Sequence, residues 1–350
     1  MQAIRIGTFE ISQNSPCYII AEVGVNHNGD LQTALKLAEE AKASGAHCVK
    51  FQTFKAASVI TRNAPKANYQ LQVTDPRESQ YEMLKKLELS PENFAKIAAH
   101  CRDIGIQFLS TPYNRADVDL LESIGVDAFK IASGQIVEYA FLAYVAEKGK
   151  PIILSTGMAT LSEIDNAIST IRNAGNDQII VLQCTTNYPS TNEDANIRAM
   201  SSIRNAFDVL VGYSDHVPNN YACYAAVALG ARVVEKHFTL DKTMPGPDHS
   251  SSLSPTEFEQ LTNGIRLIES SLGSSIKRPV KEEVRNIAGM RRSITATVDI
   301  KKGELISWEN VDFKRPGTGL TGNFSELVIN KPARVNISAD TQITLDMIEW

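Results

Sequence analysis

The sequence is poor in cysteine and lacks any long hydrophobic run. Its five cysteines are widely spaced and form no CxxC pair: Cys17, Cys48, Cys101, Cys184 and Cys223. This usage argues against a disulfide framework or a zinc knuckle and favours a reducing compartment. No apolar stretch approaches the roughly 18 residues of a membrane span. The opening MQAIRIGTFEIS lacks the apolar core of a signal peptide, so we expect a cytoplasmic protein with no membrane partner.

An excess of positive charge is also missing. Lys and Arg total 35 against 40 Asp and Glu, which gives a net charge of −5. This balance argues against binding to nucleic acid, but it allows a small anion held by a few converging lysines. With 43% hydrophobic and 21% charged residues, the 350-residue chain has enough apolar material for a large core. Its length fits about two domains, or one barrel with an appendage.

Apolar, strand-like runs recur along most of the chain. They occupy residues 17–26, 47–54, 107–113, 128–133, 151–157, 179–185, 209–216 and 232–238. Amphipathic helical patterns at 31–45, 90–105, 161–175 and 254–273 accompany them, with Asp30 and Ser90 at N-cap positions. Eight such units predict an α/β fold, a (β/α)₈ TIM barrel. The alternative is an open doubly wound sheet, whose Gly-rich GxGxxG turn is absent from GVNHNG at 24–29.

Four segments fall outside this rhythm. Ile4 to Ile11 alternates as in a short β-hairpin, and the polar stretch 55–89 is predicted to be a loop element over the barrel mouth. Residues 274–292 are charged and are interpreted as a linker, and 293–350 show short strands and turns. We therefore expect a barrel domain at 1–273, a linker at 274–292 and a small β-rich module at 293–350. A module of that size is marginal alone and is expected to dock on something.

Polar residues gather where the predicted strands end, which is the face that carries the active site in barrels of this kind. On three of these strands two polar residues are two positions apart, which places both side chains on the same face of the strand. The pairs are Lys50 and Gln52, Ser214 and His216, and Glu235 and His237. Lys50 and Lys130, with nearby serines, predict a phosphate site, because lysine supplies charge and serine supplies hydroxyl donors. The structural alternative is that these lysines pair with Glu22 and Glu235.

The histidines divide into candidates and non-candidates. His216 and His237 end neighbouring strands and suit a divalent metal ion with open positions. His249 is a third candidate on a loop, whereas His27 is expected to shape the first loop. His47 and His100 carry no motif and are interpreted as structural.

The sequence pattern leaves the chemical roles of three further residues undecided. Glu22 lies among apolar neighbours, so burial would suit it to proton transfer or water orientation. Cys184 has no His in its segment, which makes a nucleophilic thiol a weak hypothesis. Lys130 on a mid-barrel strand is also placed like the lysine of a Schiff-base aldolase.

A series of motifs resembles the sialic acid synthase family, which comprises N-acetylneuraminate synthase and related nonulosonate synthases. The motifs are AEVGVNHNGD (21–30), VKFQTFKA (49–56), STPYN (110–114), FKIASG (129–134), ILSTGM (153–158), QCTTNYP (183–189), VGYSDH (211–216), VEKHFTLDKTMPGPDHSSSL (234–253) and FKRPG (313–317). They follow one another in the family's order over nearly the whole chain. The final module resembles the family's antifreeze-like (SAF) domain.

The resemblance implies an enzyme that condenses phosphoenolpyruvate with N-acetylmannosamine or a related 2-acetamido sugar and releases phosphate. Phosphoenolpyruvate would be held by Lys50, Lys130, Ser133, Ser155, Thr186 and Ser214. The sugar would be held by Gln52, Thr111, Tyr188, Asp248 and Arg315. Arg315 would reach across a domain-swapped homodimer. His216 and His237 would bind Mn²⁺, or Mg²⁺ or Co²⁺, and Glu22 would orient the attacking water.

Two positions depart from the family pattern: Gln135 after KIASG, and Thr186 in CTTNYP, where the family varies between Asn and smaller polar residues. After KIASG the family has a carboxylate that contacts the sugar hydroxyl freed on ring opening, and this chain has Gln135. An amide can donate and accept hydrogen bonds but cannot take up that proton, so we assign Gln135 to the catalytic set with an altered role. Glu138 is three residues on and is not substituted for it. The acceptor sugar therefore stays open between the sialic and legionaminic branches. A Schiff-base aldolase and a carbohydrate-binding protein without activity are the rival functions.

Overall fold

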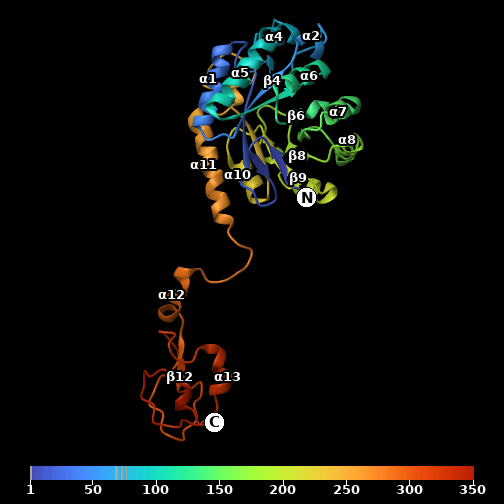
Figure 1. Cartoon of the computed structure of the whole chain (residues 1–350). Coiled ribbons are helices and arrows are strands. Elements are labelled where there is room, and N and C mark those ends of the chain that lie inside the picture. The colour runs from blue at the N-terminus through green and yellow to red at the C-terminus, as the bar shows by residue number, and fades with distance from the viewer. Residues whose placement is uncertain (1, 68–69, 72–73, 76) are drawn as a thin grey trace. The chain divides into compact units, whose positions relative to one another are not determined.

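The computed structural model describes residues 2–67, 70–71, 74–75 and 77–350. By its internal contacts the chain divides into two units, Met1–Gly273 and Ser274–Trp350 (Figure 1). Each unit has its own hydrophobic core and is described by itself.

Parallel strands form a nearly closed barrel in the first unit. The strands are β3 (Tyr18–Gly24), β4 (Cys48–Thr53), β5 (Gln107–Pro112), β6 (Phe129–Ile131), β7 (Ile152–Ser155), β8 (Ile179–Cys184), β9 (Leu210–Asp215) and β10 (Val233–His237). Their hydrogen-bonded order is β5-β4-β3-β10-β9-β8-β7-β6, and β5 and β6 lie next to each other at the remaining seam. Each strand falls within one of the predicted apolar runs, and the predicted (β/α)₈ barrel is confirmed.

Helices lie between the strands and cover the barrel. They are α1 (Leu31–Ala43), α5 (Pro91–Ile104), α6 (Arg115–Ile124), α7 (Tyr139–Ala146), α8 (Leu161–Asn173), α9 (Ala199–Phe207), α10 (Tyr221–Ala228) and α11 (Pro255–Leu272). Two of the predicted caps form as expected. The Asp30 carboxylate accepts from the Thr33 amide at 2.7 Å, and Ser90 caps α5 just before Pro91.

Each strand presents alternate residues to the barrel interior, and these residues change character along its length. At the amino ends they are apolar, such as Ile20, Ile153 and Leu210, and they pack on Ile4 and other residues of the N-terminal hairpin. That hairpin is formed by β1 (Ile4–Ile6) and β2 (Phe9–Ile11), which pair antiparallel as predicted. Toward the carboxyl ends the inward positions become polar. The barrel is therefore closed by apolar packing at one end and carries its chemistry at the other.

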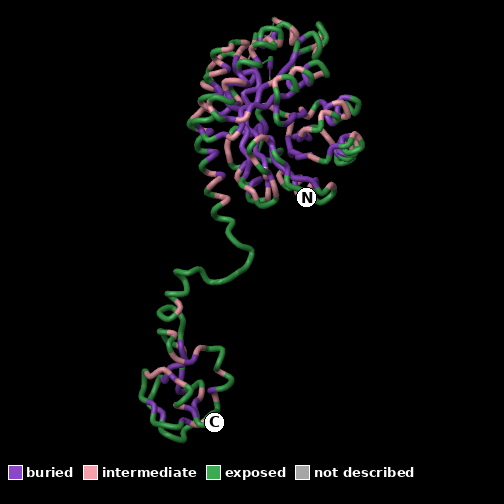
Figure 2. Tube along the Cα trace, viewed as in Figure 1, coloured by how far each residue is buried: buried purple, intermediate pink, exposed green. Residues whose placement is uncertain are grey.

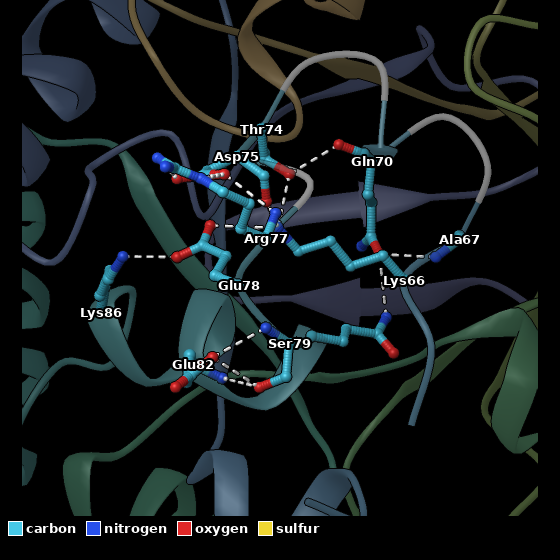
Figure 3. Close-up of polar contacts among 11 residues, drawn as sticks. Lys66, Ala67, Gln70, Thr74, Asp75, Arg77, Glu78, Ser79, Glu82 and Lys86 are labelled. Carbon is cyan, nitrogen blue, oxygen red and sulfur yellow. Dashed lines mark hydrogen bonds and ion pairs between the residues drawn. The ribbon is translucent and has the colours of Figure 1, made fainter. Parts of the chain in front are cut away.

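The described residues of the stretch 55–89, predicted to be a loop element, include two short helices. They are α2 (Ala56–Val59) and α4 (Gln80–Lys86), and residues 68–69, 72–73 and 76 lie outside the described residues. Lys66 stabilises this stretch from within (Figure 3). Its Nζ donates to Thr74 Oγ1 at 2.9 Å and to the Asp75 carbonyl at 2.7 Å, and pairs with Glu78 Oε1 at 3.1 Å.

The stretch also borders loops that follow two barrel strands. A cavity of about 500 Å³ lies among α4, Asn28 after β3 and Pro245–Pro247 after β10. Because both loops follow the carboxyl ends of their strands, the stretch lies at the barrel mouth, as the sequence predicts.

The second unit is small and has mixed structure. The segment 274–292, interpreted as a linker, contains the helix α12 (Lys281–Met290), none of whose residues is buried (Figure 2). After it, β11 (Ser293–Ala296) pairs with β12 (Val311–Lys314), and α13 (Ser325–Val328) follows. Short bridges such as Ile300 to Ile337 complete the β structure around a core that includes Ile294 and Ile343. No helix in the described part of the chain is long and apolar enough to cross a membrane.

A buried ion pair joins the outward-facing sides of β9 and β10. Lys236 Nζ lies 2.6 Å from Asp215 Oδ2, and the two side chains are 1% and 0% exposed. The Tyr213 hydroxyl and the Val217 amide donate to the other carboxylate oxygen at 2.8 and 2.9 Å. Lys236 also donates to the carbonyls of Val217 and Asn219. Because every partner is satisfied, the pair fixes the two strands that carry His216 and His237.

We predict that Lys236→Met destabilises the protein by about 3–5 kcal/mol, because it leaves the Asp215 charge buried without its cation. Urea unfolding measures the change. Lys242→Met is the matched control, since its partner Glu257 lies at 3.1 Å with both side chains more than a third exposed, and it is expected to cost less than about 1 kcal/mol. Equal losses in the two variants would contradict the role given to the buried pair.

Candidate active site

A cavity of about 120 Å³ lies at the carboxyl ends of the barrel strands. All eight strands contribute to it, because the polar residue at each strand end points inward. The predicted site residues in its lining are Glu22, Lys50, Gln52, Thr111, Lys130, Ser133, Ser155, Thr186, Tyr188, Ser214, His216 and His237. Residues far apart in the sequence thus converge in one place.

Two lysines and two carboxylates form the charged centre of the cavity. Lys50 Nζ lies 2.6 Å from Glu22 Oε2 and 3.7 Å from Glu235 Oε2. Lys130 Nζ lies 3.7 Å from Glu235 Oε1. All four side chains are less than a tenth exposed. The ion pairs that the sequence offered as the structural alternative are therefore present, and they lie inside the predicted anion site.

Burial sets the proton affinities of these groups. It raises the pKa of Glu22 to about 6, with Glu235 adding to the rise and Lys50 opposing it. It lowers the pKa of Lys130, which Glu235 offsets in part. For Glu235 burial acts upward, but the attraction of Lys130 and Lys50 outweighs it and keeps the pKa below its usual value. Glu22 is thus the carboxylate of the pair that more readily holds a proton.

Hydroxyl groups surround the lysines. Lys130 Nζ donates to Ser155 Oγ at 2.7 Å, and Lys50 Nζ donates to Thr111 Oγ1 at 3.2 Å. Thr186 Oγ1 is buried and has no hydrogen-bond partner among the described residues. A side chain at Gly157 would overlap this hydroxyl, so the glycine makes room for it. Ammonium groups with free or rotatable hydroxyls are a suitable donor set for a phosphate or carboxylate.

The two predicted metal ligands lie together on one wall of the cavity. The ring centroids of His216 and His237 are 5.3 Å apart. His216 Nδ1 lies 2.7 Å from the Thr185 carbonyl, which can only accept, so Nε2 is left to bind a metal. His237 Nδ1 is buried without a hydrogen-bond partner among the described residues. Burial, followed by the nearby His216, lowers the pKa of His237 well below its usual value, which keeps it neutral.

This donor set fits a metal ion that keeps open coordination positions. Among the described residues no group of three or more His, Cys, Asp or Glu side chains is arranged to hold a metal. Two imidazoles beside a cavity therefore suit a weakly held catalytic ion better than a closed structural site.

Asp248 lies near Gln52 and Glu22 although it does not line the cavity. A side-chain carbon at Gly24 would lie 3.2 Å from both Gln52 Nε2 and Glu22 Oε1 and 3.5 Å from Asp248 Oδ2. Gly24 has a positive φ of 56° and no side chain, so these three groups approach one another around it. Burial raises the pKa of Asp248 to about 6, which His216 offsets only in part.

Gln135 is a further predicted site residue that does not line the cavity. Gln135 ends a short 3₁₀ helix, η1 (Ser133–Gln135), and its buried Nε2 has no hydrogen-bond partner among the described residues. Arg315 belongs to the second unit, where its Nε donates to the Met290 carbonyl at 3.1 Å. Their assigned roles stay predictions.

Residues outside the predicted set also line the cavity or hold the loops around it. Tyr113 lines the cavity and donates from its hydroxyl to Gln52 Oε1 at 3.3 Å; its position just after β5, in STPYN, was the available signal. Cys184 also lines the cavity, with its sulfur 3.9 Å from His216 Nδ1, a contact that no local sequence pattern reveals. His249 contacts Thr239 Oγ1 through Nδ1 at 2.7 Å and Asn28 Oδ1 through Nε2 at 3.3 Å, so both of its ring nitrogens are engaged. His27 Nδ1 accepts from the Gly29 amide and shapes the first loop, as expected.

The fold and site are those of a (β/α)₈ barrel with buried lysine–carboxylate pairs and two histidines at the carboxyl ends of its strands. The chain belongs to the NeuB family, whose model matches residues 37–277, and a SAF domain matches 291–349. The predicted family and the predicted SAF module are thereby confirmed.

The relatives include synthases of sugar acids. N,N'-diacetyllegionaminic acid synthase of Campylobacter jejuni is 47% identical, over 93% of this chain and 98% of that protein. The enzyme of the same name from Legionella pneumophila is 43% identical, over 95% of each chain. The crystal structure of N-acetylneuraminic acid synthetase from Leptospira borgpetersenii, in complex with citrate, is 31% identical. It covers 82% of this chain and 95% of that one, with a TM-score of 0.73.

We predict that Asp248→Asn stabilises the protein at neutral pH. A carboxyl group whose folded pKa is raised to about 6 costs stability when ionised. That cost is fully present above pH 6 and is lost as the pH falls toward the usual value of about 3.9. The shift of roughly two units predicts a gain of about 3 kcal/mol at pH 8 and about half of it at pH 5. Urea unfolding at both pH values measures it, and a gain that does not shrink at pH 5 would contradict the assignment.

Proposed function

We propose that the protein condenses phosphoenolpyruvate with a 2-acetamido sugar to give a nonulosonic acid and inorganic phosphate. The observation that carries this proposal is the burial of Lys50 and Lys130 beside His216 and His237 in one cavity. The cationic pair suits the anionic donor, and the histidine pair suits a metal ion that contacts the acceptor. The names of the relatives agree with a synthase of this kind.

Phosphoenolpyruvate would be held by the lysines and the hydroxyls around them. Lys50 and Lys130 supply charge, and Ser155 already accepts a hydrogen bond from Lys130. The unpartnered hydroxyl of Thr186 is a further donor.

His216 and His237 would hold the divalent ion, with Mn²⁺ the first candidate and Mg²⁺ or Co²⁺ the alternatives. When bound there, such an ion would act as a Lewis acid toward a carbonyl oxygen of the open-chain sugar. The protein's own part is to orient His216 and to keep His237 neutral. The Thr185 carbonyl fixes the tautomer of His216. Burial lowers the pKa of His237 and so keeps its ring uncharged.

The remaining chemistry falls to the substrates and to Glu22. C3 of phosphoenolpyruvate attacks the aldehyde carbon, which leaves positive charge at C2, and the aldehyde oxygen takes up a proton to become a hydroxyl group; the proton that water later loses balances it. Water adds to C2, and cleavage of the bond between C2 and the phosphate oxygen releases phosphate. Glu22 would orient that water and accept its proton, because burial raises the pKa of its carboxyl group to about 6, close to neutrality.

The acceptor would be a 2,4-diacetamido-6-deoxy sugar in the first instance, as in legionaminic acid synthesis. The support is the higher identity to the two legionaminic acid synthases, 47% and 43%, than to the N-acetylneuraminic acid synthetase, 31%. N-acetylmannosamine is the alternative. Gln52, Tyr188 and Asp248 would contact this sugar, and Arg315 would complete the site from the second unit of a partner chain in a domain-swapped homodimer.

Phosphate release from phosphoenolpyruvate tests this function. We expect release only when an acceptor is added, fastest with the diacetamido sugar, slower with N-acetylmannosamine and slowest with its 6-phosphate. Release is expected to stop with a chelator and to return with Mn²⁺. Equal release from chelated and metal-restored protein would remove the metal from the proposal. Borohydride trapping of pyruvate on Lys130, without phosphate release, would instead support the aldolase.

Metal binding can be tested apart from activity. We predict that His216→Ala and His237→Ala each weaken Mn²⁺ binding at least 10-fold, because each removes one of two ligands. The relaxation rate of water protons measures bound Mn²⁺ directly. His100→Gln is the control, since His100 lies on α5 and contacts Glu39 at 3.3 Å. Unchanged Mn²⁺ binding in both alanine variants would place the metal elsewhere.

A further inference from the structure

Glu235 lies at the centre of the charged cluster, and the proposed reaction gives it no task. Its carboxylate is reached by both lysines at 3.7 Å, one on each oxygen. Ser214 Oγ donates to Oε1 at 2.9 Å, whereas Oε2 is buried without a hydrogen-bond partner among the described residues. The side chain belongs to β10, two residues before His237, and lines the cavity.

The two carboxylates of the cluster hold their lysines differently. Glu22 approaches Lys50 at 2.6 Å, which is hydrogen-bond distance. Glu235 stays at 3.7 Å from each lysine, beyond hydrogen-bond distance but within reach of charge attraction. In the described part of the chain, Glu235 is also the one carboxylate in ion-pair contact with Lys130. A loosely held partner is one that an incoming anion can replace.

We propose that Glu235 is a built-in counter-ion that competes with phosphate for Lys50 and Lys130 and so limits how tightly the site holds phosphate. This rests on the proposed function, in which phosphate is both part of one substrate and the final product. Two lysines and two carboxylates sum to no net charge, so an entering phosphate must compete with a carboxylate that is already in place. The same competition helps the product phosphate to leave.

The charge of Glu235 matters because the cluster would hold an anion more tightly without it. Removing Glu235 alone would leave the buried Lys130 charge without an anion, and an uncompensated buried charge binds any available counter-ion strongly. Tight binding of substrate and product alike raises affinity without raising turnover. Glu235 thereby favours phosphate release over retention.

The test uses inorganic phosphate as the probe, the full-length protein and a chelator, so that only the protein's own charges act on the anion. Glu235→Gln keeps the shape and the Ser214 contact but removes the charge, and we expect its Kd for phosphate to fall about 10-fold by calorimetry. Glu235→Asp withdraws the carboxylate by one methylene group, and we expect a fall of about threefold. In turnover, the KM for phosphoenolpyruvate and the kcat are both expected to decrease for Glu235→Gln.

Glu259→Gln is the matched control, because it makes the same change of charge at an exposed position on α11 and should leave the phosphate Kd unchanged. A purely structural Glu235 predicts the opposite result, weaker phosphate binding together with a lower unfolding midpoint. Phosphate binding that is unchanged or weaker in both Glu235 variants would overturn the proposal. Since phosphate binding needs no sugar, failure of every acceptor tested would refute the proposed function and leave this result standing.

Discussion

The burial of four charged side chains inside a closed barrel is the constraint on which this site depends. Lys50, Lys130, Glu22 and Glu235 all lie within the cavity with little exposure. Charges without water around them are tolerated only when partners compensate them. The cluster is therefore neutral in sum, and each lysine has a carboxylate within reach. In the proposed function, an anion that binds there would compete with those carboxylates for the lysines.

The barrel supplies this cluster through one simple rule, the alternation of side chains along each strand. The inward positions are apolar near the hairpin and polar near the mouth, as on β3, where Ile20 is followed by Glu22. The outward positions of the same strands pack under the helices. On β9 and β10 these outward positions also hold the Asp215–Lys236 pair. One face of each of these strands thus serves stability, while the other serves the proposed reaction.

The parts of this arrangement that depend on local chemistry could be predicted from the sequence. Apolar runs located the strands, Asp30 and Ser90 located helix starts, and the spacing of Ser214 with His216 and of Glu235 with His237 placed them on one face. The helix α12 was missed because a charged segment resembles a linker when no tertiary partner is known.

Contacts between distant segments were beyond the reach of sequence patterns. The central place of Glu235 depends on the distances between three strands, and the approach of Cys184 to His216 joins β8 to the residue that follows β9. The grouping of Asp248 with Gln52 depends on the missing side chain of Gly24. Each of these follows from packing in three dimensions, which one-dimensional spacing does not encode.

The most direct test of the account follows oxygen atoms during turnover in water enriched in ¹⁸O. If the lysine cluster holds the phosphate group while water adds to C2 of phosphoenolpyruvate, the label appears in the sugar acid and none enters the released phosphate. Mass spectrometry of both products, at early times before the keto group exchanges, measures this. Label in the phosphate would mean that water attacks phosphorus, which would contradict the account.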